Sequence, residues 1–219
     1  MGHSELFIDG VWYPSVTTIM GAAPKPWLQA WKDKWGVLAV RKTKIASAVG
    51  TEFHRCVESW LDTGAYTVTA PTVDGFSMPS TIRRVEGMVQ SWVAWAASVD
   101  GTIDHTELQV VSHAHTYSGT LDAVGHFGKT PMVIDWKTSS RIYPEMALQL
   151  SAYAEAYNAQ TGSKIKTGLI VHVSKDRPYK LTTKEFKLGK RVFKQFMELR
   201  EMFDGIRAEL AFTIQGRAE

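Results

Sequence analysis

Cysteine is almost absent from this chain of 219 residues, in which Cys56 is the only one. A single thiol cannot close a disulfide within the chain, and it cannot supply the several sulfur ligands of a cysteine-held metal site. The sequence therefore excludes a disulfide framework, a cysteine-held zinc site and an iron–sulfur cluster.

Long apolar runs and an excess of one charge are also missing. No run approaches the roughly 18–20 apolar residues of a membrane-spanning helix, and the opening MGHSELFIDG lacks the apolar centre of a signal peptide. The 25 basic and 22 acidic residues leave a formal net charge of +3, which permits a polyanionic partner without requiring one. We therefore expect an intracellular, soluble protein with no membrane partner.

What is present suffices for a folded domain. Hydrophobic residues make up 44% of the chain, and the sequence contains no internal repeat and no low-complexity segment. Residues 1–100 show mainly helical patterns, whereas residues 101–219 contain strand-like runs separated by glycine turns. We expect residues 1–219 to form a single domain, with a mainly helical N-terminal part and a sheet-containing core.

The individual elements follow from apolar spacing and from cap residues. The segment LFIDGVWYPS is typical of a short hairpin, Gly64 marks the end of a helix, and Ser80 or Thr81 is a candidate N-cap. Residues 63–80 resemble a loop. Helices are predicted over residues 24–42, 44–64, 80–99, 143–159 and 188–210, with three strands over 106–138 and two near 166–174 and 179–186. This order predicts an α/β (α+β) sandwich with a central mixed sheet of about five strands flanked by helices.

Three of the eight tryptophans lie on one helical stripe, because Trp27, Trp31 and Trp35 are spaced four residues apart. Such a stripe is either a buried face that joins helices or a surface on which single-stranded bases stack. We favour the buried face, because Leu28 and Leu38 lie close to the same stripe.

The segment VIDWK contains an acid and a lysine where a buried strand ends. Asp135 and Lys137 are two residues apart, so both side chains leave one face of the strand while Trp136 points into the core. Asp122 lies on the preceding strand, where a hairpin can bring the two carboxylates together. Adjacent carboxylates repel unless a cation lies between them, and Mg²⁺ and Mn²⁺ favour oxygen ligands.

Four further residues join this pattern through their positions. His54 lies on a helix, Glu107 lies on the first predicted strand, and Gln149 and Tyr153 share one helical face. None of them is informative alone, because a single helical histidine more often packs or caps than binds a metal. The prediction of a metal site rests on their joint order along the chain.

That order resembles the PD-(D/E)XK nuclease superfamily, and within it the RecB-like exonuclease branch of phage-type and mitochondrial genome maintenance exonucleases. The matching segments are GTEFH, the glutamate of TELQV, GTLDAV, VIDWKTS and QLSAY, which span about residues 50–153. The early YPSVTTIM is similar to the opening of phage members. The resemblance implies the restriction-endonuclease-like core of that superfamily.

The resemblance also implies roles. Asp122 and Asp135 would bind the metal together with the backbone carbonyl of Trp136, and Lys137 would be the catalytic lysine. His54 would be the metal ligand that marks the RecB-like branch. The acid before the lysine is Asp or Glu in the superfamily, and Asp is usual in this branch.

The remaining positions would support the reaction. Glu107 would be an accessory acid, and Gln149 and Tyr153 would hold the DNA end or the metal-bound waters. Ser139 and Arg141 follow Lys137 closely and are candidates for binding DNA phosphates. Other basic residues of the helical part suit either phosphate contacts or an ordinary solvated surface, and we favour the solvated surface for most of them. These residues are Lys32, Lys34, Arg41, Lys42, Lys44, Arg83 and Arg84.

The function implied is a metal-dependent DNA exonuclease that hydrolyses phosphodiester bonds from DNA ends with one or two Mg²⁺ or Mn²⁺ ions. It would act in phage or bacterial DNA replication, recombination or repair, in the cytoplasm of a bacterium or a phage-infected host cell. Its partners would be single-stranded DNA or the end of double-stranded DNA, with a single-strand-binding or annealing protein as a further candidate. The alternatives are an endonuclease of the same superfamily and a catalytically inactive nucleic-acid-binding module.

Overall fold

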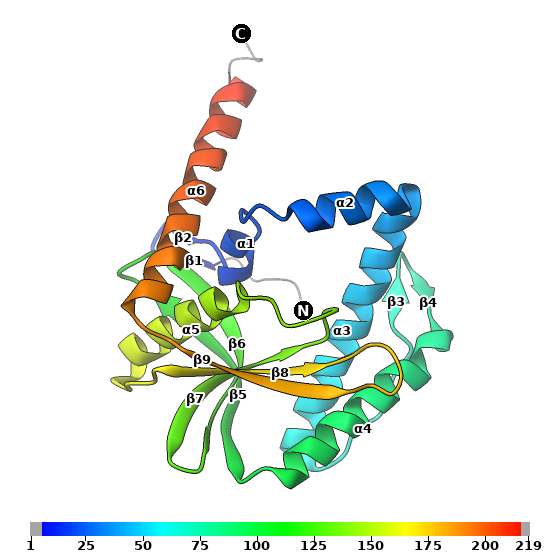
Figure 1. Ribbon diagram of the computed structural model, residues 1–219. Coiled ribbons are helices and arrows are strands. Elements are labelled where there is room, and N and C mark those ends of the chain that lie inside the picture. Colours follow the sequence, from blue (N-terminus) through cyan, green and yellow to red (C-terminus); the bar gives the residue numbers. More distant parts are fainter. Residues whose placement is uncertain (1–5, 216–219) are drawn as a thin grey trace.

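A five-stranded sheet lies between two groups of helices in the computed structural model (Figure 1), which describes residues 6–215 except for the side chains of Trp27 and residues 212–215. In chain order the elements are β1 (Leu6–Ile8), β2 (Val11–Tyr13), α1 (Val16–Met20), α2 (Pro26–Trp35), α3 (Val37–Thr63), β3 (Thr72–Val73), β4 (Phe76–Ser77), the 3₁₀ turn η1 (Pro79–Thr81), α4 (Ile82–Ser98), β5 (Gly101–Ser112), β6 (Tyr117–Phe127), β7 (Thr130–Lys137), α5 (Met146–Thr161), β8 (Thr167–Val173), β9 (Leu181–Lys187) and α6 (Lys190–Gln215). Within residues 6–215, no helix combines the length and the apolar character that crossing a membrane requires.

The central sheet has the strand order β5-β6-β7-β8-β9. Every neighbouring pair is antiparallel except β7 and β8, which run parallel and are connected through α5. A parallel pair needs such a crossover, because a tight turn cannot return the chain to the same end of the sheet. The predicted mixed sheet of about five strands with flanking helices is confirmed.

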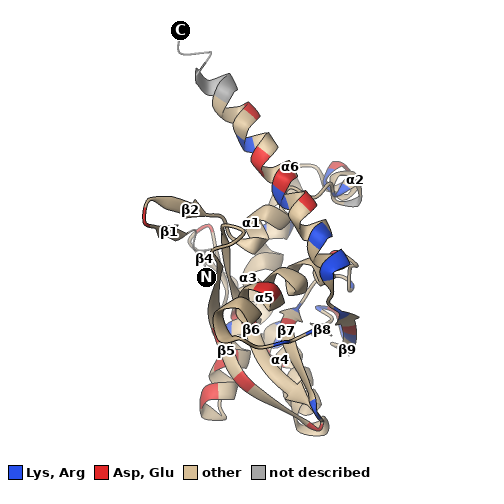
Figure 2. Cartoon of the chain, turned by 90° about the vertical axis from the view of Figure 1, so that its left-hand side faces the viewer, with Lys and Arg blue, Asp and Glu red and all other residues tan. Residues whose placement is uncertain are grey.

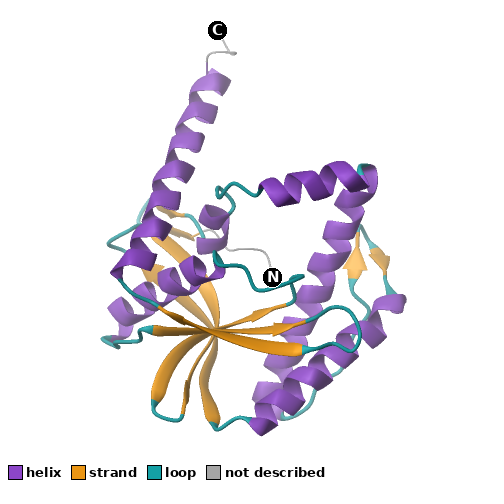
Figure 3. Ribbon diagram, viewed as in Figure 1, coloured by secondary structure: helices purple, strands orange, loops and turns teal. Residues whose placement is uncertain are grey.

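Two apolar cores cover the two faces of the sheet. Helices α1, α5 and α6 pack on one face around Leu121, Val133 and Leu150, and α3 and α4 pack on the other around Phe53 and Trp92. Figure 3 shows these purple helices on either side of the orange strands. Consecutive residues of β7 serve opposite cores, as the strand period requires. The end of β7 is therefore held from both faces.

Helix α6 is the element that leaves this body. Figure 2 shows it extending away from the sheet with acidic and basic residues along its length. Intrahelical ion pairs join Lys194 to Glu198 at 3.9 Å and Arg200 to Asp204 at 2.8 Å. Its first turns still contact the core, because Phe196 is fully buried.

The helices before the sheet differ from the prediction at two points. The predicted helix over 24–42 is interrupted at Gly36, which has a φ of +50° and separates α2 from α3. Glycine adopts that conformation without the steric cost that a side chain would add. The short helix α1 was not predicted, although its N-cap Ser15 accepts a hydrogen bond from the Thr18 backbone N–H at 3.0 Å.

The predicted loop over 63–80 contains a small hairpin, β3–β4, and Glu52 of α3 holds the segment before it. The Glu52 carboxylate accepts hydrogen bonds from the backbone N–H of Thr69 at 2.6 Å and from its hydroxyl at 2.9 Å. Thr81 does occupy the N-cap position of α4, but its hydroxyl donates to the Met78 carbonyl at 2.7 Å instead of capping the helix. The predicted side-chain cap is therefore wrong.

The tryptophan stripe of α2 is not a buried face. Trp35 is 37% exposed and Leu38 is 53% exposed, and the Lys42 ammonium lies 3.8 Å above the Trp35 ring centre. Trp31 is half-buried at the edge of a large pocket, and the Trp27 side chain lies outside the described part. The buried interpretation is therefore wrong for Trp35 and Leu38. The tryptophan core is instead formed by Trp92 with Trp60, Trp95 and Trp136.

Candidate active site

A pocket of about 1150 Å³ lies where α3 passes the ends of β6 and β7 and the start of α5. Nine of the ten residues predicted for the site line it, and Arg141 is the exception. The nine residues are His54, Glu107, Asp122, Asp135, Trp136, Lys137, Ser139, Gln149 and Tyr153. The sequence order therefore translates into one location, although these residues come from five different elements and one loop.

Three potential metal ligands from α3, β5 and β6 lie close together in the pocket. One ligand atom from each of His54, Glu107 and Asp122 lies within 4.8 Å of the other two, and the His54 Nδ1 to Asp122 Oδ2 distance is 3.5 Å. Asp122 is fixed there because its Oδ2 accepts a hydrogen bond from the Trp136 backbone N–H at 2.7 Å. A nitrogen and two carboxylate oxygens at this separation suit a single divalent cation.

Glu107 occupies an unusual backbone position. It lies between the register pairs Thr106–Ala123 and Leu108–Leu121, so it stands opposite Asp122. Its φ of +48° is in the left-handed region, which residues with a side chain rarely adopt. Such strain persists where the surrounding structure enforces it and is frequent at functional sites. Glu107 was expected to be an accessory acid near the site, but its carboxylate lies close enough to His54 and Asp122 to bind the same metal ion.

Asp135 and Lys137 form a close ion pair beside this group. The Lys137 Nζ donates a hydrogen bond to Asp135 Oδ1 at 2.9 Å and lies 2.7 Å from Oδ2. The Asp135 side chain is only 2% exposed. Its Oδ2 receives no hydrogen bond of regular geometry from the described residues. A buried carboxylate oxygen with spare lone pairs is a suitable further ligand for a cation.

Burial dominates the electrostatics of the acids. Removal from water, helped by the neighbouring Asp122 carboxylate, raises the pKa of Glu107 to about 7. Burial also raises the pKa of Asp122 to about 6 and that of Asp135 to about 6, although the Lys137 ammonium acts in the opposite direction on both. Carboxylates that hold protons this strongly are destabilised as anions, and a bound cation would relieve that cost.

The pKa values of His54 and Lys137 shift in opposite directions. Burial and the nearby Lys137 charge lower the pKa of His54 to about 4, so its imidazole is neutral at physiological pH and free to bind a metal. Burial alone would lower the pKa of Lys137, but Asp135 and Asp122 outweigh it and the net pKa is raised. Lys137 therefore remains an ammonium, with a positive charge fixed beside the acids.

Close packing explains two glycines of the sequence motifs. A Cβ at Gly119 would lie 2.7 Å from the ring of Tyr153, and a Cβ at Gly50 would lie 3.1 Å from the Thr138 hydroxyl. Tyr153 is buried, and its hydroxyl accepts a hydrogen bond from the Gln149 amide at 3.1 Å. The glycine of GTLDAV thus lets α5 approach β6.

The predicted phosphate-binding residues are placed less directly. Ser139 lines the pocket, but its hydroxyl donates to the Arg141 carbonyl at 2.7 Å. The Arg141 guanidinium is exposed and lies 5.0 Å from the centre of the Tyr143 ring. The sequence analysis missed Lys175, which lines the same pocket from the β8–β9 connection. No motif marks this residue, since a lysine after a strand is an ordinary feature.

The fold and the pocket together define a nuclease-type α/β protein. The chain belongs to the PD-(D/E)XK nuclease superfamily, whose family model matches residues 36–218. This match confirms the resemblance carried by the sequence motifs.

Two further proteins are similar to this chain, one in sequence and one in fold. Mitochondrial genome maintenance exonuclease 1 of Mus musculus is 29% identical over 181 residues, which cover 74% of this chain and 50% of that protein. This chain thus spans about half the length of that curated relative. A protein from Eubacterium rectale described as a candidate exonuclease has a similar fold, with a TM-score of 0.52 at 11% identity over 88% of this chain and 82% of that one.

Proposed function

We propose that this protein is a metal-dependent deoxyribonuclease that hydrolyses phosphodiester bonds from DNA ends. The observation that carries the proposal is the meeting of His54, Glu107 and Asp122 beside the Asp135–Lys137 ion pair in one pocket. Membership of a nuclease superfamily supports phosphodiester hydrolysis, and similarity to a protein named as an exonuclease supports attack at DNA ends.

The residues present fit a divalent cation. His54, Glu107 and Asp122 would hold it, with the Asp135 Oδ2, which also lies 2.7 Å from Lys137 Nζ, as a further ligand. The mixed nitrogen and oxygen ligands favour Mn²⁺ or Mg²⁺ over a thiophilic metal. When bound, such an ion supplies a Lewis acid that activates water and offsets the charge of the scissile phosphate.

Lys137 contributes a fixed positive charge. Its raised pKa keeps it protonated, so it donates hydrogen bonds and does not remove a proton in the resting site. Asp135 holds the ammonium at 2.7–2.9 Å and prevents it from rotating away. Lys137 orients the attacking water and offsets the charge that develops on the phosphate oxygens. Gln149 and Tyr153 support the DNA end from α5.

A digestion experiment tests this function. Single- and double-stranded oligonucleotides with 5′ or 3′ labels, in linear and closed circular form, are incubated with Mg²⁺, Mn²⁺ or a chelator. We expect stepwise shortening of linear DNA, no cutting of circles and no reaction with the chelator. Cleavage of closed circles would identify an endonuclease, and binding without any cleavage would identify an inactive binding module.

Metal binding separates the enzyme from a structural protein with fortuitous acids. Asp122→Asn removes a ligand while keeping the hydrogen bond from the Trp136 backbone within reach of the remaining oxygen. We expect it to abolish high-affinity Mn²⁺ binding in calorimetry. Equal Mn²⁺ affinity in both proteins would contradict the proposed metal site.

A further inference from the structure

Two further cations, Lys175 and Arg84, line the same pocket as the acids, and we call them the basic wall. Lys175 follows β8 and Arg84 lies in the first turn of α4, and both are half-buried pocket residues. The Lys175 Nζ donates a hydrogen bond to the Ala46 carbonyl of α3 at 3.1 Å. Neither cation forms an ion pair within 4 Å among the described residues, in contrast to Lys137.

This arrangement leaves two neighbouring cations without an ion pair to either among the described residues. Burial and the nearby Arg84 lower the pKa of Lys175 to about 8, and Asp176 opposes the shift more weakly. Two cations held near each other in a partly dry site are mutually destabilising, and an anion between them removes that cost. Ser47 also lines the pocket, and its hydroxyl can donate a hydrogen bond to an anion.

The position relative to the acids fits a polymeric substrate. Ala46, which anchors Lys175, and His54 lie eight residues apart on α3, which corresponds to about 12 Å along a helix. Stacked nucleotides rise about 3.4 Å each, so this distance corresponds to a few nucleotides of one strand. We call the pocket surface formed by Glu107, Asp122 and Asp135, with His54 and Lys137 beside them, the acidic wall. A DNA strand with one phosphate at the acidic wall would present another phosphate to Lys175 and Arg84.

We propose that Lys175 and Arg84 form a second phosphate-binding subsite, which holds a phosphate of the DNA strand a few nucleotides from the bond being cut. This inference rests on the proposed nuclease function and specifies how the strand is held. The phosphate can be an internal phosphodiester or a terminal 5′-phosphate, and the experiment below separates the two.

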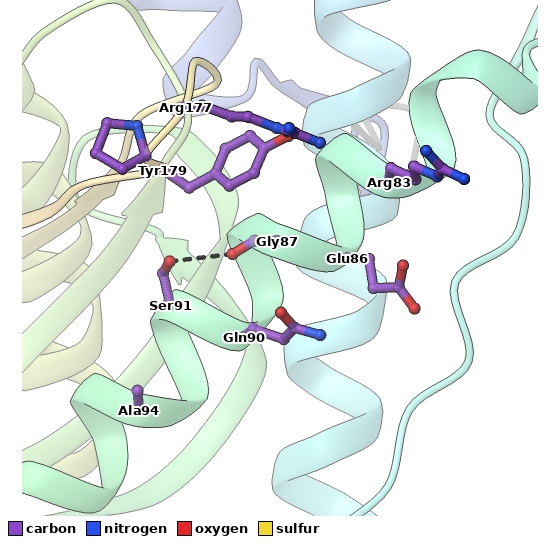
Figure 4. A pocket seen from close by; sticks show the side chains of 9 residues that line it. Arg83, Glu86, Gly87, Gln90, Ser91, Ala94, Arg177 and Tyr179 are labelled. Carbon is purple, nitrogen blue, oxygen red and sulfur yellow. Dashed lines mark hydrogen bonds between the residues drawn. The ribbon is translucent and has the colours of Figure 1, made fainter.

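The connection that carries Lys175 is firmly attached to α4. The Tyr179 ring lies beside Gly87 of α4 (Figure 4), and a Cβ added to Gly87 would come within 2.3 Å of the ring. Arg177 reaches the Tyr179 hydroxyl from the same connection at 3.5 Å. Because this contact fixes the connection, the ammonium is positioned before DNA arrives, and preorganised donors bind more strongly than flexible ones.

Binding of a labelled 12-nucleotide oligothymidylate tests the subsite. Fluorescence anisotropy is measured in Ca²⁺ over a range of salt concentrations, with intact oligonucleotide verified on gels. We expect Lys175→Gln and Arg84→Gln each to weaken binding about five- to tenfold and to reduce the salt slope by about 0.7, the value for one lost contact to a single strand. Lys175→Arg should restore most of the affinity.

The matched control is Lys129→Ala, which removes an exposed charge from the β6–β7 turn outside the pocket. Melting temperatures show whether Lys175→Gln disturbs folding, and Arg84→Gln carries the test if it does. Weakening of 5′-phosphorylated and 5′-hydroxyl oligonucleotides alike assigns the subsite to an internal phosphate, and weakening of the phosphorylated form alone assigns it to the terminus. Unchanged affinity and salt slope in both variants would overturn the subsite.

Cleavage kinetics keep this inference distinct from the proposed function. With Mg²⁺, loss of a phosphate contact away from the reacting atoms should raise KM about fivefold and leave kcat within about twofold. Wild-type cleavage with unaffected Lys175 and Arg84 variants would refute only the subsite. A wild-type protein that neither binds nor cuts DNA would refute both proposals.

Discussion

The acidic and basic walls of the pocket differ in whether their lysine forms an ion pair with a carboxylate. On the acidic wall, Lys137 is paired with Asp135 through both carboxylate oxygens. On the basic wall, Lys175 donates a hydrogen bond to the Ala46 carbonyl and has no carboxylate within 4 Å among the described residues. Burial raises the pKa values of the acids and lowers that of Lys175, so each wall disfavours its own charge.

This difference indicates which charged ligand each wall binds. Lys137 forms its ion pair with Asp135, and neither Glu107 nor Asp122 has a lysine or arginine within 4 Å among the described residues, so that wall suits an additional metal ion. The basic wall has no carboxylate partner and suits an anion. A phosphodiester strand with a divalent cation at one phosphate satisfies both walls at once.

Removal of the paired cation should have the largest effect. Lys137→Ala leaves the metal ligands in place but removes the charge that orients water, so we expect cleavage to fall by about 10³-fold. Oligonucleotide binding should change less than about threefold, because the basic wall is intact. The measurement is single-turnover cleavage with binding followed in parallel, and wild-type cleavage by this variant would end the catalytic assignment.

Substitution of Glu107 tests whether this residue binds the metal ion together with His54 and Asp122. Glu107→Gln removes a carboxylate that lies with His54 and Asp122, so we expect Mn²⁺ affinity to fall by about 10- to 100-fold in calorimetry. Glu185→Gln, on the exposed side of β9, is the charge-matched control. Equal affinities in the two variants would return Glu107 to an accessory role.

The pH dependence of metal binding should reveal the raised pKa values of the acids. A protonated carboxylate is a poor ligand, so affinity is lost as pH falls through about 7 for Glu107 and about 6 for Asp122. His54, with a pKa of about 4, stays neutral over this range. We expect Mn²⁺ affinity to fall on the order of 10- to 100-fold between pH 8 and 5.5, and a flat profile would contradict these shifts.

The smallest effect concerns the support of the basic wall. Gly87→Ala pushes the Tyr179 ring away from α4 and should lower the free energy of unfolding by about 1–3 kcal/mol, the usual cost of overpacking. DNA affinity should fall about threefold through the displaced Lys175, with metal affinity unchanged. Chemical denaturation and anisotropy provide the two measurements. The matched control is Gly189→Ala, which has open space around its Cβ position.

The sequence predicted the acidic wall because its residues lie in short motifs. The spacing of Asp135 and Lys137 places both on one face of a strand, and this local rule does not depend on the rest of the fold. The basic wall has no such signal. Lys175 and Arg84 are far apart in the chain, and only the packing of the β8–β9 connection on α4 brings them to one pocket.

The tryptophans show the same limit for the core. Helical spacing made Trp31 and Trp35 candidates for a buried face, yet Trp92 is fully buried and Trp35 is exposed. Periodicity identifies which residues share a face of a helix, but it does not reveal whether another element covers that face. The break at Gly36 separates α2 from α3, and of the described tryptophans of the stripe Trp31 lies beside the pocket.

Local periodicity and short motifs were enough to predict the mixed sheet, the order of its strands along the chain and the candidate residues of the acidic wall. They did not predict that Glu107 joins His54 and Asp122, that Asp135 pairs with Lys137, or that Lys175, which has no ion pair among the described residues, lines the same pocket. These facts depend on distances between segments far apart in the chain, which are set by the packing of helices on the two faces of the sheet.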